Sequence, residues 1–360
     1  MQRVYNFSAG PATLPLEVLE RAQRDLVCMP GWGMSLLEIS HRDPRFVAIM
    51  DETVACLGRL LGIPQTHQVL FLQGGSRLQF SMVAMNLMGD RFAPAEYLVT
   101  GTWGKNAATE AMKAGQVKTL WDGAASDYSQ LPAQAELAAD ENAAYVHYTS
   151  NETIQGVQFG EVPACGNAPL VCDASSDFLS RSIPLDRLGV IYACAQKNAG
   201  PAGVTVVIIR KDLLDRSDDQ LPGYLNYAAH AQANSLWNTP STFGIYMVGL
   251  VAQWLEESVG GLDKVHCQNC AKAELLYEVI DSSDGFYQGH SAIECRSNMN
   301  VTFRLPSVDS EQGFLSGAEE RDLVNLKGHR SVGGIRASVY NAMPLEGAER
   351  LATWMREFAQ

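Results

Sequence analysis

Strand and helix patterns alternate along the middle of the chain, and this alternation constrains the fold more than any other feature. Short apolar runs that end in turns or glycine-rich loops stand at 69–72, 97–100, 145–148, 169–173 and 190–195. Helix-like patterns follow the first two runs, and the rhythm lasts from about residue 68 to residue 211. Elements in this order form a mostly parallel sheet with helices on both faces, which places the chain in the α/β class.

The pattern changes near residue 260. A helix, a strand at 300–305, a helix, a strand at 333–339 and a final helix then follow one another, which predicts a second, smaller α+β domain. The length of 360 residues agrees with two domains, because a single hydrophobic core stops growing at about 250–300 residues.

Composition excludes several classes of protein. A hydrophobic fraction of 46% and a charged fraction of 19% are typical of a globular chain and exclude disorder. The net charge of −13 argues against a nucleic-acid partner, and no apolar run is long enough to span a membrane. Because the cysteines are scattered and no leader sequence is recognisable, we expect a cytoplasmic protein.

Lys197 stands where a cofactor could use its amine. It follows the apolar run at 190–195 and precedes a turn cluster at 198–203 and a β-branched run at 204–209. Burial at the mouth of a strand lowers the pKa of an amine and makes it the nucleophile that a Schiff base requires. The alternative is a lysine that points into solvent at a strand end, which is the commoner case for a lone lysine.

Asp173 ends the apolar run at 169–173, so it and Lys197 would face the same crevice if their strands are parallel neighbours. Pyridoxal phosphate needs such a pair: a lysine that holds its aldehyde and an acidic partner for its pyridinium nitrogen. The alternative for Asp173 is a helix N-cap, which is common after a strand. The pair is more specific than either member, and it predicts a pyridoxal phosphate site.

Gly74, Gly75 and Ser76 connect the run at 69–72 to a helix pattern. Backbone amides at such a helix start, with the hydroxyl of Ser76, suit a phosphate group. A dinucleotide-binding loop would need a third glycine, which is absent here, and a simple tight turn remains an alternative.

Cys267 and Cys270, with His266, resemble half of a zinc site. They lie in an expected helix at 262–280, and no second pair at matching spacing completes four ligands. We therefore expect no metal, and we expect these cysteines to pack in the core.

Segments along the whole chain resemble the phosphoserine aminotransferase family. They are YNFSAGPATLP (5–15), ISHRDPRF (39–46), FLQGGSRLQF (71–80), TWGKNA (102–107), TSNETIQG (149–156), CDASSDFLSR (172–181), AQKNAGPAG (195–203), NTPSTF (238–243) and GHRSVGGIRASVYNAM (328–343). They follow the family's order. The visible departure is Ser76, where glycine or alanine is also usual in the family, and its hydroxyl should add a donor to the phosphate.

This resemblance implies an aspartate-aminotransferase-like, fold-type-I homodimer with shared active sites and pyridoxal 5'-phosphate as cofactor. The implied reaction moves the amino group of glutamate to 3-phosphohydroxypyruvate and gives phosphoserine and 2-oxoglutarate, in serine biosynthesis. In many bacteria the family also acts on 3-hydroxy-2-oxo-4-phosphooxybutanoate, in pyridoxine biosynthesis. The implied division is an arm at 1–15 near the small domain, a large cofactor-binding domain at 16–259 and a small domain at 260–360.

The resemblance also implies the cofactor contacts. Lys197 would carry the Schiff base and shuttle the proton, Asp173 would pair with the ring nitrogen, and Trp103 would stack on the ring, although a tryptophan is often simply buried. The remaining cofactor contacts would be Ser76, Arg77 through its backbone, Thr153, Gln196 and, from the neighbouring subunit, Asn238 and Thr239.

Both substrates are multiply anionic, and guanidinium groups bind such anions through paired, charge-assisted hydrogen bonds. By resemblance, Arg336 would bind the α-carboxylate. The pocket for the distal phosphate or carboxylate, to which either subunit could contribute, would consist of His41, Arg42, Arg77, His329 and Arg330. A lone arginine is more often a solvated surface charge, so the assignment of these arginines to substrate binding depends on their positions within the family's motifs.

Three functions compete. The first is phosphoserine aminotransferase activity, and the second is that of another fold-type-I enzyme, such as a serine–pyruvate-type transaminase or a cysteine desulfurase. A desulfurase needs a reactive cysteine on a mobile loop, which we do not identify here. The third is a catalytically inactive binding protein, against which the presence of Lys197, Asp173 and Arg336 speaks.

Overall fold

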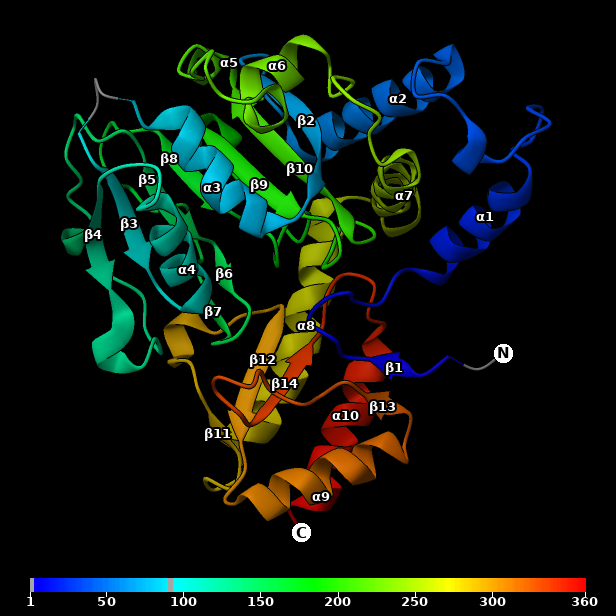
Figure 1. Ribbon diagram of the computed structural model, residues 1–360. Helices are drawn as coiled ribbons and strands as arrows, with labels where there is room; N and C mark the ends of the chain where they lie inside the picture. The colour runs from blue at the N-terminus through cyan, green and yellow to red at the C-terminus, as the bar shows by residue number, and fades with distance from the viewer. Residues whose placement is uncertain (1–2, 90–92) are drawn as a thin grey trace.

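The computed structural model describes residues 3–89 and 93–360, and a seven-stranded sheet forms its centre (Figure 1). In spatial order the strands are β2 (His67–Gly74), β10 (Gly203–Arg210), β9 (Val190–Cys194), β8 (Leu170–Asp173), β5 (Val146–Thr149), β3 (Ala95–Val99) and β4 (Val117–Asp122). Neighbouring strands are parallel, except that β10 runs antiparallel to β2 and to β9. The predicted mostly parallel sheet is confirmed, and the expected strands agree with the observed ones to within about two residues.

Helices cover both faces of this sheet. One face carries α3 (Ser76–Leu87), α4 (Thr102–Ala111), α5 (Lys211–Leu214) and α6 (Tyr227–Gln232), and α3 and α4 lie in front of the sheet in Figure 1. The other face carries α1 (Leu16–Val27), α2 (Pro44–Leu61) and α7 (Thr242–Gln253). Because both faces are covered, the central strands read as continuous apolar runs.

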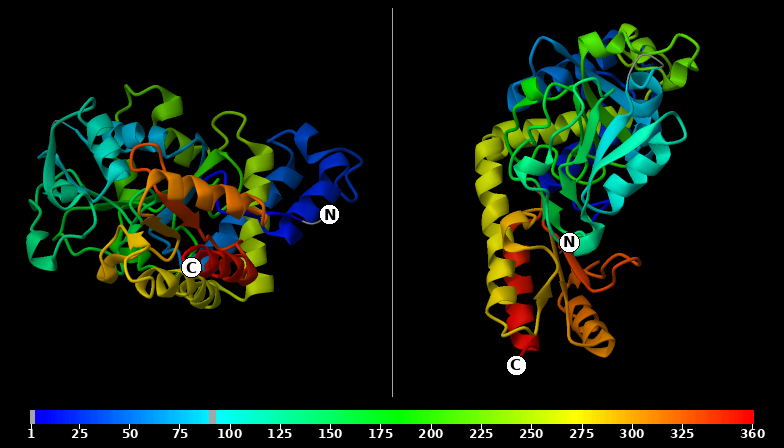
Figure 2. Two further views of the ribbon diagram at one scale, coloured as in Figure 1. Left: turned by 90° about the horizontal axis from the view of Figure 1, so that it is seen from below. Right: turned by 90° about the vertical axis from the view of Figure 1, so that its left-hand side faces the viewer.

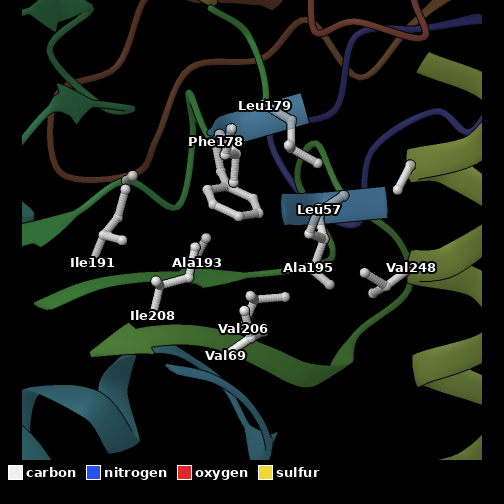
Figure 3. Packing of buried hydrophobic residues seen from close by; sticks show 14 of the residues in the cluster. Leu57, Val69, Phe178, Leu179, Ile191, Ala193, Ala195, Val206, Ile208 and Val248 are labelled. Carbon is white, nitrogen blue, oxygen red and sulfur yellow. The ribbon is translucent and has the colours of Figure 1, made fainter. Parts of the chain in front are cut away.

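The packing between strands and helices follows the alternation of side chains along a strand. Figure 3 shows Leu57 of α2 and Val248 of α7 near Ala195 and Val206, all of them buried in one cluster. Ile191 and Ala193 of β9 belong to that same cluster, whereas Tyr192, which stands between them in the sequence, is buried in the cluster on the opposite face of the sheet. Successive side chains of β9 thus enter two different hydrophobic layers.

The C-terminal part forms the expected α+β unit. Its elements are α8 (Leu262–Asp281), β11 (Gln288–Gly289), β12 (Asn300–Arg304), α9 (Val308–Glu319), β13 (Leu323–Val324), β14 (Ile335–Ser338) and α10 (Leu345–Phe358). β11, β12 and β14 form an antiparallel sheet, and its core contains the edge-to-face rings of Phe303 and Phe314. Figure 2 shows α8 running from the large part of the molecule to this smaller unit.

The N-terminal segment joins the small unit. β1 (Tyr5–Asn6) pairs in parallel with β13, and Phe7 is buried in the same cluster as Phe303. Farther along, the backbone N–H of Ala12 donates to the carbonyl of Gln196 at 2.9 Å. The segment therefore links the C-terminal unit to the loop that carries Lys197. The domain limits at residues 15 and 259 stay a prediction.

The sequence patterns missed two features of the large part. β4 is an edge strand with half-exposed and exposed residues, so it lacks the apolar run that marks the inner strands. A short hairpin of β6 (Asn151–Glu152) and β7 (Val157–Gln158) follows β5 and is too short to show a pattern.

The expectation that both cysteines of α8 pack in the core was wrong. Cys267 is exposed, and Cys270 is half-buried with its Sγ 3.7 Å from Nε2 of His266. In the described part of the chain, no group of three or more His, Cys, Asp or Glu side chains is placed to hold a metal ion. Within the same residues, no helix is both long and apolar enough to cross a membrane.

The position of Phe7 makes a prediction about stability. Phe7→Ala should lower the free energy of unfolding by about 3–5 kcal/mol, because it opens a cavity in the small core. Urea denaturation would measure the loss. Val4→Ala is the matched control, since Val4 is 47% exposed, and an equal loss in the two variants would show that the arm is not part of that core.

Candidate active site

A cavity of about 400 Å³ lies where β8 and β9 end and β14 approaches them. Such a crevice at the carboxyl ends of parallel strands is where open α/β sheets bind ligands. Its lining includes these predicted site residues: Ser76, Arg77, Trp103, Thr153, Asp173, Gln196, Lys197, His329 and Arg336. A larger cavity, of about 750 Å³, lies between the N-terminal arm and α8 and holds none of the predicted residues.

The amine of Lys197 is held inside the cavity. Its Nζ donates a hydrogen bond to Oγ1 of Thr153 at 2.5 Å and lies 5.7 Å from the ring centroid of Trp103. The arm closes one side, since a Cβ added to Gly10 would lie 3.2 Å from Cγ of Lys197. The arm and Thr153 therefore bound Lys197 on two sides, and the lysine lines the cavity.

Asp173 is the last residue of β8 and is buried. Ser175 donates its backbone N–H at 3.0 Å and its hydroxyl at 2.5 Å to Oδ1 of Asp173. Burial raises the pKa of Asp173, while the bonds from Ser175 and the charge of Lys197 oppose that rise. Because both bonds from Ser175 go to Oδ1, the second oxygen is left for a donor in the cavity.

The hydroxyl of Ser76 is directed toward this carboxylate. Its Oγ lies 2.5 Å from Oγ of Ser175, which already uses its single proton on Asp173. Ser76 must therefore be the donor of the pair. Ser76 also lines the cavity, and the contact of its hydroxyl with a phosphate stays a prediction.

The start of α3 is open toward the cavity. Gly75 is its N-cap, has no side chain to accept the first N–H groups, and follows Gly74, whose φ of 95° is in the left-handed region that favours glycine. Free N–H groups and the positive end of the helix dipole favour an anion at this point.

Several buried polar atoms of the cavity lining have no hydrogen-bond partner among the described residues. They are Oε1 of Gln196, Nε1 of Trp103 and Nε of Arg336. Buried polar groups normally have partners, so these atoms indicate a polar ligand. An amine, a carboxylate, an aromatic face and an anion-binding helix start together fit pyridoxal phosphate.

Arg336 lies on β14 and brings the small unit to the site. Burial lowers the pKa of its guanidinium, and it lines the cavity together with His329. Burial, followed by the charges of Arg336 and Arg330, also lowers the pKa of His329. A concentration of cationic groups that are costly to bury is typical of a site for an anion.

Five predicted residues lie outside the lining of this cavity, within the part of the chain that the structure describes. They are His41, Arg42, Asn238, Thr239 and Arg330. Arg42 and Arg330 are exposed, and the carbonyl of Thr239 accepts a hydrogen bond of 2.6 Å from Gln73 at the end of β2.

Among the residues of this region that sequence reasoning missed are Gly10, Glu152 and Ser175. Gly10 lies beside the lysine although it comes from a segment nearly two hundred residues away, which no local pattern reveals. Glu152 and Ser175 stand inside the motifs that identified Thr153 and Asp173, and that position was the available signal.

Comparison with known proteins gives the same assignment. A family model described as aminotransferase class-V matches residues 4–351. A phosphoserine aminotransferase of Rhodopirellula baltica is 53% identical, with 99% of this chain and 96% of that protein covered. A second one, of Laribacter hongkongensis, is 52% identical with 99% of each chain covered.

Solved structures agree with these relatives. Phosphoserine aminotransferase of Bacillus circulans subsp. alkalophilus has a TM-score of 0.97 at 48% identity, covering 100% of this chain and 99% of that one. The pyridoxal phosphate-bound enzyme of Trichomonas vaginalis has a TM-score of 0.93 at 40% identity, covering 98% and 100%. The chain therefore belongs to the class-V aminotransferases and, within them, to the phosphoserine aminotransferase family, whose cofactor is pyridoxal phosphate.

Proposed function

We propose that this chain transfers the amino group of L-glutamate to 3-phosphohydroxypyruvate, giving O-phospho-L-serine and 2-oxoglutarate in serine biosynthesis. One observation carries the proposal: Lys197, Asp173 and Arg336 line the same cavity. An amine, a buried carboxylate and a cation are what a transaminase needs for its cofactor and for the α-carboxylate of its substrates.

Lys197 and Asp173 divide the proton transfers. Bound pyridoxal phosphate supplies a carbonyl carbon that takes up the amino group and a ring that withdraws electrons. The carboxylate of Asp173 holds a proton on the ring nitrogen, and Nζ of Lys197 takes the proton from Cα of the amino acid. Thr153, whose Oγ1 is 2.5 Å from Nζ, orients that amine.

The other cofactor contacts come from around the cavity. The indole of Trp103 stacks on the ring, and the backbone N–H groups of Ser76 and Arg77 receive the phosphate at the start of α3. Gln196 supplies a polar side chain from the lysine loop. Asn238 and Thr239 lie outside this cavity, and they are assigned to the phosphate of a second copy of the chain.

The anionic groups of the substrates bind cationic side chains of this chain and of a second copy of it. Arg336 binds the α-carboxylate, and Arg77 and His329 receive the distal phosphate or carboxylate from within the same cavity. The other members of the distal pocket, supplied by the second copy of a homodimer with shared sites, are His41, Arg42 and Arg330.

The same cations suit 3-hydroxy-2-oxo-4-phosphooxybutanoate, the substrate of the pyridoxine branch. It carries an α-carboxylate and a phosphate one carbon farther away, and the exposed, flexible side chain of Arg77 can follow that shift. A serine–pyruvate-type transaminase would leave Arg77 and His329 without an anion to bind.

The chain's eight cysteines are all free, which supports a cytoplasmic location.

Lys197→Ala should lower the rate of transamination by at least about 10²–10⁴-fold, because it removes the group that moves the Cα proton. Phosphoserine formation would be followed together with the visible absorption of the bound cofactor and the far-ultraviolet circular dichroism. The fold should be unchanged. Near-normal turnover would show that another residue carries the proton.

Asp173→Asn should slow the loss of the Cα proton by about 10²–10³-fold, because a neutral amide cannot hold the ring nitrogen protonated. Single-turnover kinetics with glutamate would measure the step. Asp177→Asn is the control, since Asp177 is a buried carboxylate held by Ser150 and Gln158 outside the cavity lining. Equal rates for the two variants would refute the role of Asp173.

Arg42→Ala should lower kcat/KM for phosphoserine by about ten- to a hundredfold, through loss of a charge-assisted hydrogen bond, and leave alanine turnover unchanged. Mixing this variant with Lys197→Ala tests whether Arg42 acts across a dimer. Random hybrids would regain about a quarter of the parental activity, because half of the dimers would contain one intact site. No recovery would place Arg42 in the site of its own chain or outside it.

A further inference from the structure

Glu152 makes a contact that the proposed reaction does not use. It is fully buried at the end of β6, and its two carboxylate oxygens accept backbone N–H groups from the first turn of α4, Trp103 at 3.0 Å and Gly104 at 2.8 Å. The residue at the N-cap of α4, Gly101, supplies no side-chain hydrogen bond. A carboxylate from 49 residues farther along the chain therefore caps this helix.

The backbone of Gly101 lies very close to the side chain of Glu152. A Cβ added to Gly101 would lie 2.5 Å from Cδ of Glu152, so glycine is needed for the close approach. Gln155 supports the same turn, because its Nε2 donates to Oγ1 of Thr102 at 2.8 Å. Figure 1 shows β6 beside α4, so the hairpin of β6 and β7 rests on the start of the helix.

The charge of Glu152 is costly in this place. Burial raises its pKa to about 7, and the bonds from Gly104 and Trp103 oppose that rise. A buried carboxylate is retained only where its hydrogen bonds are needed. The next residue, Thr153, binds Lys197, so two consecutive side chains hold the lysine and the start of α4.

We propose that Glu152 is a positioning residue, which holds the backbone of Trp103 so that its indole forms a wall of the cofactor cavity. The proposal rests on the proposed function, in which Trp103 stacks on the ring of pyridoxal phosphate. Glu152 does not line the cavity, so it acts through Trp103. The indole is also set among cations, 5.5 Å from Cζ of Arg77 and 5.7 Å from Nζ of Lys197, so a displaced α4 would disturb both.

A double-mutant cycle tests this assignment. Isothermal titration of the apoprotein with pyridoxal phosphate would give the dissociation constant for the parent, Glu152→Ala, Trp103→Ala and the double variant. We expect Glu152→Ala alone to raise the constant about tenfold. In the Trp103→Ala background the same substitution should change it by less than about twofold, because two residues that act through one contact are not additive.

The matched control is Ser307→Ala. Ser307 caps α9 in the small unit, where its Oγ accepts from the N–H of Ser310 at 3.1 Å, far from the cavity lining. It should lower the melting temperature, as loss of a helix cap does, and leave the dissociation constant unchanged. Should Glu152→Ala not fold, Glu152→Gln keeps the volume and one acceptor oxygen, and the same cycle is run with it.

Each outcome is decisive. Additive losses in the double variant, or Glu152 variants that bind the cofactor as the parent does, would overturn the positioning role. Parental affinity in Trp103→Ala alone would instead overturn the stacking role of Trp103 in the proposed function, which separates the two failures.

Discussion

The parallel pairing of β8 with β9 is the contact on which the site depends. Its register sets Asp173 opposite Tyr192, so β8 ends at the carboxylate two residues before β9 ends at Cys194 and the lysine loop begins. Both strands are buried on both faces, and α2 and α7 press on one side while α3 packs on the other. A shift of one residue would turn Asp173 into the opposite hydrophobic layer, where an unpaired carboxylate is expensive.

The active centre is accordingly built from groups that are unfavourable in isolation. Asp173 and Glu152 are buried carboxylates, and burial raises the pKa of each. Hydrogen bonds from Ser175 to the first and from the backbone of α4 to the second offset part of the desolvation. These neighbours explain how two buried acidic side chains remain close to one lysine.

Much of this arrangement could be predicted from the sequence, for a physical reason. The inner strands are continuous apolar runs, and Lys197 and Asp173 interrupt that pattern at strand ends, so both were visible. Glu152 and Gly10 were not, because each lies beside a residue far away in the chain, Glu152 beside Trp103 and Gly10 beside Lys197. His41 and Arg42 stand in family motifs but do not line the cavity, and no spacing rule shows where such side chains lie in space.

The N-terminal arm has a mechanical consequence. One end of it is a strand of the small unit, and the other end lies against the loop that carries the lysine, through Ala12 and Gly10. The arm thus connects the small unit, to which Arg336 belongs, with the loop that carries Lys197. Because both ends of the arm are hydrogen-bonded, any displacement of the small unit relative to the large one would change the position of Arg336 and the surroundings of Lys197 together.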